Sequence, residues 1–289
     1  MNLVDFDYYV PDSLYDACSL LTEKGNGAKL LAGGTDLLNK MKHGLTAPEA
    51  LISLKNLEQL TAIDYVPGKG VVIGARATHN AISNSSLLQK KYLSICEAAQ
   101  HMANNQVRNI GTIGGNIANA VPSADLPPIL IALGALVTLV SINGERVMPL
   151  EEFFAGPGKT HLNQGEILTE IVIPDNSYTG SNYIKFGLRR SGALAVVGVA
   201  VAIEFEDKIC KNARIALGAV APVPMRAKKA EAIIIGNAVT EELLEQVGLC
   251  ASTECKPISD IRGSEEYRRD MVRVFTKRAF RKAVNEGHV

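Results

Sequence analysis

The stretch RNIGTIGGNIANAVPSADLPP, from Arg108 to Pro128, decides how this chain is read. It holds three glycines, three asparagines and three prolines, and few side chains suited to a hydrophobic core. Long loops without a function are uncommon in compact domains. The segment Thr112–Asn116 would offer backbone N–H groups to an anion, and Asn119, Ser123 and Asp125 would offer polar groups to sugar hydroxyls. We therefore expect a ligand site here; a long surface loop is the alternative.

A second glycine-rich loop lies in LLAGGTDLL, residues 30–38. The apolar run before it predicts a short strand, and the residues after Asp36 predict a helix. Gly33 and Gly34 let the backbone turn tightly and approach a ligand, and N–H groups at a helix start bind anions. A tight strand-to-helix turn explains the same residues equally well. Two anion-binding loops without a Walker-A lysine suit the diphosphate of a dinucleotide, and the absence of G-x-G-x-x-G argues against a Rossmann domain.

The remaining pattern predicts alternating small sheets and helices. Ser13 and Gly25 cap a first helix, a hairpin turns at Pro67–Gly70, and a helical region spans residues 81–101. A polar linker is predicted at Asp175–Asn182. Three strands and then three helices follow it, which indicates an α+β arrangement. These are the strands YIKFGL, ALAVVGVAVAIEFE and ICKNARIALGAV and the helices MRAKKAEAIII, TEELLEQVGLCAS and SEEYRRDMVRVFTKRAFRKAVNEG.

Composition excludes several classes of function. The 30 basic and 30 acidic residues balance, so no charge excess favours nucleic acid. The N-terminus lacks the features of a secretion signal and no apolar run is long enough to span a bilayer, so we expect a cytoplasmic protein. The five scattered cysteines indicate reduced thiols and no metal site, and the histidines form no triad-like group.

Taken together and in order, four motifs resemble the FAD-binding subunit of the molybdenum hydroxylases. These are LAGGTDLL, IGTIGGNIANAVPSADLPP, GEILTEIVIP and YIKFGLRRSGALAVVGVAVAIEF. The resemblance covers essentially the whole chain. It implies an α+β fold: a PCMH-type FAD-binding unit of two subdomains, residues 1–57 and 58–176, then a C-terminal α+β domain, residues 177–289, with a small antiparallel sheet and helices.

The resemblance also implies which residues hold FAD. The first glycine loop would follow the diphosphate, the second would form the other side of the clamp, and Asp125 would bind sugar or ribityl hydroxyls. Leu168 would lie against the flavin and Lys185 near its polar edge, where a cation stabilises the reduced ring. His101 or Met102 matches a position near adenine. The full set is Lys29, Leu30, Leu31, Ala32, Gly33, Gly34, Thr35, Asp36, His101, Ile110, Gly111, Thr112, Gly114, Gly115, Asn116, Asp125, Leu168 and Lys185.

By the same resemblance, this chain would transfer electrons, and it would contain no catalytic acid or base. Partner subunits would hold a molybdenum cofactor and two 2Fe–2S clusters, the substrate would be a purine or N-heterocycle such as xanthine or nicotinate, and NAD+ or another acceptor would receive the electrons. Ser191–Leu194 follow Arg189 and Arg190 where relatives of the eukaryotic xanthine dehydrogenase type carry acidic residues, which weighs against NAD+ as the acceptor. A stand-alone flavin reductase and an assembly subunit without flavin are the alternatives.

Overall fold

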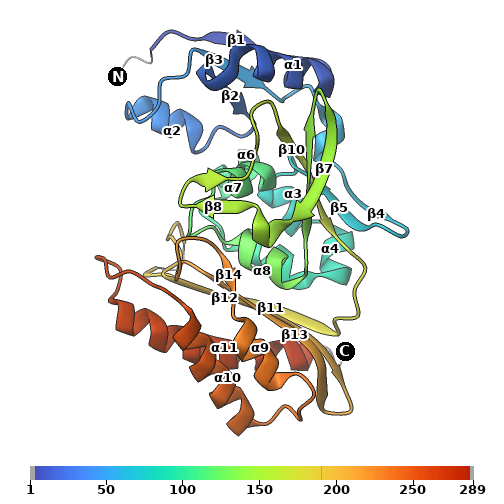
Figure 1. Ribbon diagram of the computed structural model, residues 1–289, viewed down its shortest axis with the longest axis vertical. Helices are drawn as coiled ribbons and strands as arrows, with labels where there is room; N and C mark the ends of the chain where they lie inside the picture. Colours follow the sequence, from blue (N-terminus) through green and yellow to red (C-terminus); the bar gives the residue numbers. More distant parts are fainter. Residues whose placement is uncertain (1–3, 190, 287–289) are drawn as a thin grey trace.

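The computed structural model describes residues 4–189 and 191–286, in which three sheets follow one another along the long axis (Figure 1). The first sheet has the strand order β1-β3-β2, the second β4-β5-β10-β6-β7, and the third β11-β12-β13-β14. A two-stranded ribbon, β8-β9, accompanies the second. This mixture confirms the predicted α+β class, while the exact domain boundaries remain predictions.

The first sheet is parallel and belongs to the N-terminal end of the chain. Ser13 accepts the N–H of Asp16 at the start of its first helix, and Gly25, with φ 58°, ends that helix as predicted. A small core of its own lies between α1 and the strands. The elements are β1 (Asp7–Tyr9), α1 (Leu14–Lys24), η1 (Gly25–Gly27), β2 (Ala28–Leu31), α2 (Leu37–Lys42) and β3 (Ala50–Ser53).

The second sheet is antiparallel and contains the predicted hairpin, with glycines of positive φ at its turn. Its strands are β4 (Ile63–Val66), β5 (Gly70–Gly74), β6 (Leu136–Ser141), β7 (Gly144–Pro149) and β10 (Ile167–Ile173). The short elements beside it are η2 (Glu58–Thr61), η3 (Leu150–Glu152), β8 (Phe154–Gly156) and β9 (Lys159–Thr160). Between the hairpin and β6 the chain forms the helices α3 (His79–Ser83), α4 (Ser86–Lys91), α5 (Leu93–Gln100), α6 (Asn105–Ile110), α7 (Ile113–Ala118) and α8 (Leu126–Ala132).

The single helical region predicted over residues 81–101 is divided into three short helices. The hydroxyl of Ser85 accepts the N–H of Leu88 and starts a new helix, and Tyr92 takes an extended φ of −147° that separates α4 from α5. The Ser85 hydroxyl bonds to the backbone and favours the start of a new helix over continuation of the previous one. The spacing of apolar residues alone does not reveal this competition.

The stretch Arg108–Pro128 is also not the long surface loop that was the alternative to a ligand site. Most of it is helical, and Ile113 and Ile117, one turn apart on α7, are fully buried together with Leu126. Two isoleucines at i and i+4 were enough to fix one face of a short helix in the core. The glycines and prolines obscured that signal.

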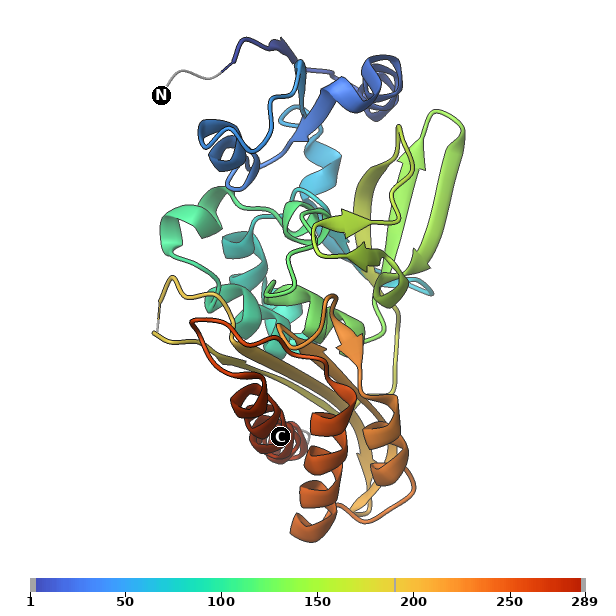
Figure 2. The ribbon, with the colours of Figure 1, turned by 60° about the vertical axis from the view of Figure 1, so that its left-hand side comes forward.

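The third sheet is antiparallel and covered on both faces. Helices α9–α11 pack on one face and α5 and α8 on the other (Figure 2). Its first strand begins at Gly180, so the linker is shorter than the predicted Asp175–Asn182. The elements are β11 (Gly180–Phe186), β12 (Val197–Glu206), β13 (Ile209–Gly218), β14 (Met225–Arg226), α9 (Lys228–Ile234), α10 (Glu241–Glu254) and α11 (Glu265–Glu286).

A buried arginine ties the start of α11 to this sheet. Arg268 is 2% exposed and donates from Nη1 to the carbonyls of Val196 and Ala219, each at 3.1 Å. Its Nη2 lies 2.6 Å from a carboxylate oxygen of Asp260. Arg262 contacts the same carboxylate, but its side chain is 31% exposed.

We predict that Arg268→Leu lowers the free energy of unfolding by about 3 kcal/mol, because a buried carbonyl and a half-buried one lose their donor and Asp260 loses its buried partner. The matched variant Arg262→Leu, which removes the other partner of Asp260, should cost less than about 1 kcal/mol. Denaturant unfolding of both variants measures this. Equal losses would show that the Asp260 ion pair, and not carbonyl satisfaction, is what Arg268 provides.

Candidate cofactor site

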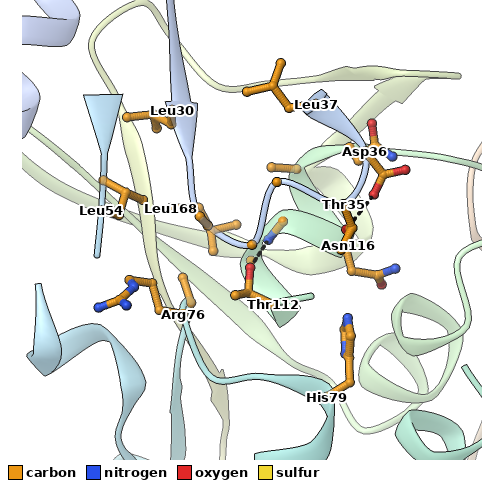
Figure 3. A pocket seen from close by; sticks show the side chains of 18 of the residues that line it. Leu30, Thr35, Asp36, Leu37, Leu54, Arg76, His79, Thr112, Asn116 and Leu168 are labelled. Carbon is orange, nitrogen blue, oxygen red and sulfur yellow. Dashed lines mark hydrogen bonds between the residues drawn. The ribbon is translucent and has the colours of Figure 1, made fainter. Parts of the chain in front are cut away.

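A cavity of about 560 Å³ lies between the first and second sheets (Figure 3). Its walls are the β2–α2 loop, helix α7, the end of β5, the turn after α5 and the start of β10. The volume falls in the range of small-molecule sites, about 300–1,000 Å³. Apolar side chains such as Leu54, Met102 and Leu168 line it beside polar groups, as expected for an organic cofactor.

The two glycine-rich segments touch through their backbones. A Cβ placed on Gly33 would lie 1.9 Å from the carbonyl oxygen of Ile110, so no other residue fits there without moving the chain. A Cβ on Gly114 would lie 2.6 Å from the Cβ of Ala75. These two glycines therefore allow protein backbones to pack closely. Gly34, with φ 71°, makes the tight turn that follows.

The first loop has backbone N–H groups to offer. In the described part of the chain, no protein acceptor takes the N–H of any residue from Gly33 to Asp36, whereas the carbonyls of Gly34 and Asp36 accept helical bonds. Successive unpaired N–H groups around a glycine turn form a concave anion-binding surface. The prediction of an anion site from AGGTD agrees with this geometry.

The second loop uses its N–H groups differently from the first. The N–H groups of Ile113 and Gly114 donate to the carbonyls of Ala77 and Ala75, and those of Gly115 and Asn116 donate to the hydroxyl and carbonyl of Thr112. These four donors are therefore used within the protein, by Thr112 and by the carbonyls of Ala75 and Ala77, and a role of this loop in binding an anion stays a prediction. What the segment presents to the cavity is side chains and close packing.

Two buried polar atoms beside the cavity have no hydrogen-bond partner among the residues that the structure describes. They are Nδ1 of His79 and Oδ1 of Asn116, and Figure 3 shows the His79 ring directed toward Asn116. Buried polar atoms are normally paired, so an unpaired couple on a cavity wall points to a ligand. Burial lowers the pKa of His79 to about 4, helped by the nearby positive charge of Arg108, so the ring is neutral at pH 7.

The charged lining is positive overall. Its charged side chains are three cations, Lys29, Lys40 and Arg76, and one carboxylate, Asp36. Lys40 donates to Oδ1 of Asn119 at 2.6 Å, which links α2 to the end of α7 across the cavity. Burial lowers the pKa of Arg76, whose Nη1 donates to the carbonyl of Leu57. The unpaired N–H groups and this excess of cations suit a diphosphate.

The structure brings together twelve of the eighteen predicted residues on this cavity. They are Lys29, Leu30, Ala32, Gly33, Gly34, Thr35, Asp36, Thr112, Gly114, Gly115, Asn116 and Leu168. Ile110 and Gly111 support the contact at Gly33, and Leu31 lies in the strand before the loop. Met102, the stated alternative to His101, lines the cavity, whereas His101 does not.

Asp125 and Lys185 do not line the cavity but form a buried pair with one another. Lys185 Nζ lies 2.7 Å from Asp125 Oδ2, and the hydroxyl of Tyr183 donates to Oδ1 at 3.0 Å. Burial raises the pKa of Asp125 against the opposing effect of Lys185. A third bond runs from Lys185 to the carbonyl of His101 at 3.2 Å. The pair thus joins the third sheet to the helices behind the cavity.

Lys40, Arg76 and His79 were not identified from the sequence. Lys40 follows Asp36 by one helical turn, and this spacing predicts that both side chains lie on the same face of the helix. Arg76 and His79 come just after the hairpin, and their chain position carries no sign of the cavity. Arg190, paired with Arg189 in the prediction, lies outside the described residues.

Within the described residues, no group of three or more His, Cys, Asp or Glu side chains could hold a metal ion. All five cysteines are free thiols, as expected, and burial raises their pKa. Across residues 4–189 and 191–286, every helix is too short or too polar to cross a bilayer.

Comparison with known proteins gives matches over nearly the whole chain. Residues 4–176 match the FAD binding domain in molybdopterin dehydrogenase, and residues 182–283 match the CO dehydrogenase flavoprotein C-terminal domain. The carbon monoxide dehydrogenase medium chain of Hydrogenophaga pseudoflava is 37% identical over 279 residues, 96% of each chain. The glyceraldehyde dehydrogenase medium chain of Sulfolobus acidocaldarius is 34% identical over 279 residues, 96% of this chain and 98% of that one.

A solved structure supports the same relationship. Carbon monoxide dehydrogenase from Hydrogenophaga pseudoflava, in a form that lacks the Mo-pyranopterin moiety of the molybdenum cofactor, contains a chain that superposes with a TM-score of 0.95. The two chains are 37% identical, and the match covers 99% of each. Fold and sequence therefore agree along the chain.

We predict that His79 makes the free energy of unfolding decrease as the pH falls. Because its pKa is about 4 in the folded state and about 6.5 when unfolded, the unfolded chain binds more protons between these values. The contribution of neutral His79 to the free energy of unfolding is nearly complete at pH 7 and falls by about 2 kcal/mol between pH 7 and pH 5. The difference in unfolding free energy between wild type and His79→Gln should shrink by that amount. His161→Gln, at an exposed histidine, is the control and should leave the wild-type pH dependence in place.

Proposed function

Because this chain belongs to the family of FAD-binding subunits of the molybdenum hydroxylases, we propose that it binds FAD in the cavity described above. The observation that carries the proposal is the loop Gly33–Asp36, whose N–H groups are free in a cavity with a positive lining. These groups would hold the diphosphate, with Lys29 and Lys40 adding charge.

The other residues fit the remaining parts of such a ligand. His79 Nδ1 can accept or donate according to its tautomer, and Asn116 Oδ1 can accept from a sugar hydroxyl or ring N–H. Leu168 and Met102 offer apolar contact to a flat ring. Asp125 and Lys185 would contact the cofactor only if the atoms of their ion pair also bonded to it. Lys185 would then place a positive charge beside the ring.

Bound FAD would supply the chemistry, which is the storage of two electrons and their release one or two at a time. We propose that these electrons come from 2Fe–2S clusters of one partner subunit. A second partner with a molybdenum cofactor would oxidise the substrate. This chain's residues bind the cofactor, orient it and set the charge around it, and none of them acts as an acid, base or nucleophile.

The substrate and the acceptor are the finer part of the proposal. We propose a purine or N-heterocycle as the substrate of the complex and NAD+ or another small acceptor as the outlet. The relatives reported above are named for carbon monoxide and for glyceraldehyde, so similar subunits belong to enzymes with chemically different substrates. The substrate pocket would therefore lie on a partner chain.

A pair of variants at Gly115 tests the cavity. This residue is exposed, and a Cβ there meets only the Thr112 hydroxyl, at 3.0 Å. Gly115→Asp adds a carboxylate beside the expected diphosphate and should weaken FAD binding by at least about tenfold, whereas the isosteric Gly115→Asn should weaken it much less. Flavin absorbance after gel filtration and titration of the apoprotein measure this. Equal retention of FAD by wild type and both variants would contradict the assignment.

Purification of the tagged chain from cells that make the whole complex tests the role in electron transfer. We expect a yellow preparation, bleached by dithionite, that carries along iron- and molybdenum-containing chains. A yellow monomer with substrate turnover of its own would support the stand-alone flavin reductase. A colourless chain that cannot be reconstituted with FAD would support the assembly subunit.

A further inference from the structure

A buried carboxylate holds the turn that leads into β10. Glu166 is 9% exposed, and each of its carboxylate oxygens accepts one bond from Arg146 on β7 and one from Asn163. The bonds from Arg146 are 2.7 and 2.8 Å long, and those from the backbone and side-chain N–H groups of Asn163 are 2.7 and 3.0 Å. Arg146 also donates to the carbonyl of His161 at 2.7 Å. We call this set of bonds the Glu166 anchor.

The anchor depends on the charge of Glu166. The bonds from Arg146, helped by those from Asn163, outweigh the effect of burial and lower the pKa of Glu166 to about 2. An ionised carboxylate accepts at both oxygens and donates at neither, so it satisfies all four donors at once. An amide of the same shape would turn an N–H group toward one donor of Arg146 and one of Asn163.

The turn closed by the anchor contacts the unit that forms the other wall of the cofactor cavity. Gly165 has φ 82°, and a Cβ there would lie 2.5 Å from the hydroxyl oxygen of Thr22 on α1. At the end of α1, a Cβ on Gly25 would lie 3.0 Å from Nε2 of Gln164. Helix α1 packs on the first sheet, whereas the turn leads into the second. The anchor therefore fixes a contact between the two units that enclose the cavity.

The two residues that follow Glu166 form part of the cavity wall. Ile167 and Leu168 both line the cavity (Figure 3), although successive residues of a regular strand face opposite sides of a sheet. Directly after Leu168 the register of β10 against β6 shifts, with Thr169 as the additional residue of a bulge. The carbonyl of Thr169 accepts the N–H of Ala75 at 2.8 Å. Leu168 is thus held from both sides, by the anchor before it and by the bonded bulge after it.

We propose that Glu166 is a positioning residue for the cofactor, which acts through Arg146 and Asn163 to hold Leu168 where it meets the bound ring. The inference rests on the function proposed above, in which Leu168 offers apolar contact to the flavin. Glu166 lies behind the cavity lining, so its effect on the ligand is indirect. Loss of its charge would release the turn and let the β10 side of the wall shift.

The test compares Glu166→Gln with Glu170→Gln in the full chain, with FAD as the probe. Glu170 lies on the same strand and forms a more exposed ion pair with Lys69, so it is the matched control. Glu166→Gln should weaken FAD binding by at least about fivefold, and the control should change it by less than about twofold. At saturating FAD, Glu166→Gln should also alter the visible circular dichroism of the bound flavin, because the ring meets a displaced wall. The control should leave that spectrum unchanged.

A second variant keeps the test decisive if Glu166→Gln fails to fold. Arg146→Gln removes two of the four bonds from the more exposed end of the anchor and should change the flavin spectrum in the same way. If both residues act through one anchor, the double variant should weaken FAD binding by less than the product of the two single effects. Independent, multiplying effects would contradict the anchor.

The outcomes separate this proposal from the FAD assignment. A wild-type Kd and a wild-type spectrum in Glu166→Gln and Arg146→Gln, with only a lower free energy of unfolding, would overturn the positioning role. Absence of FAD binding by the wild-type chain would instead overturn the proposed function. Hydrogen exchange of the unliganded chain then tests the anchor directly, because residues 162–168 should exchange faster in Glu166→Gln than in Glu170→Gln. Equal exchange in the two variants would overturn the inference.

Discussion

At Gly33 the backbone of the β2–α2 loop lies against the carbonyl of Ile110, and this contact sets the distance between the first and second sheets. Any side chain at that position would push the two walls of the cofactor cavity apart. The N–H groups of the two segments that meet there are used differently. With α7 held by its own cap and by Ala75 and Ala77, the first loop is left with unpaired donors that face the cavity.

The cavity wall is therefore built from two unlike segments. Gly33–Asp36 supply backbone donors, and the segment around Thr112 supplies shape and the amide of Asn116. The Asp125–Lys185 pair belongs to neither and joins the third sheet to the turn after α5. Because a buried pair is costly to break from one side, the third sheet and the cavity wall are held in a fixed relation.

Much of this arrangement was readable from the sequence, and the failures have physical causes. Strong apolar patterns predicted β12, β13 and α11, and Ser13 and Gly25 predicted the limits of α1. Short helices were missed where a local cap at Ser85 overrode apolar spacing. The glycines at 33 and 114 were interpreted as making room for a ligand, although each makes room for another part of the protein. That distinction depends on which distant backbone arrives at the site, and His79 and Arg76 were missed for the same reason.

The first sheet has the smallest of the three hydrophobic cores, and the cavity lies along its boundary with the second. A ligand that contacts both walls would add its binding free energy to the stability of the folded chain by mass action. At a concentration one hundred times Kd this amounts to about 2.7 kcal/mol. Occupancy of the cavity thus acts as a structural element of the N-terminal end, so cofactor supply during synthesis would influence how much folded protein accumulates.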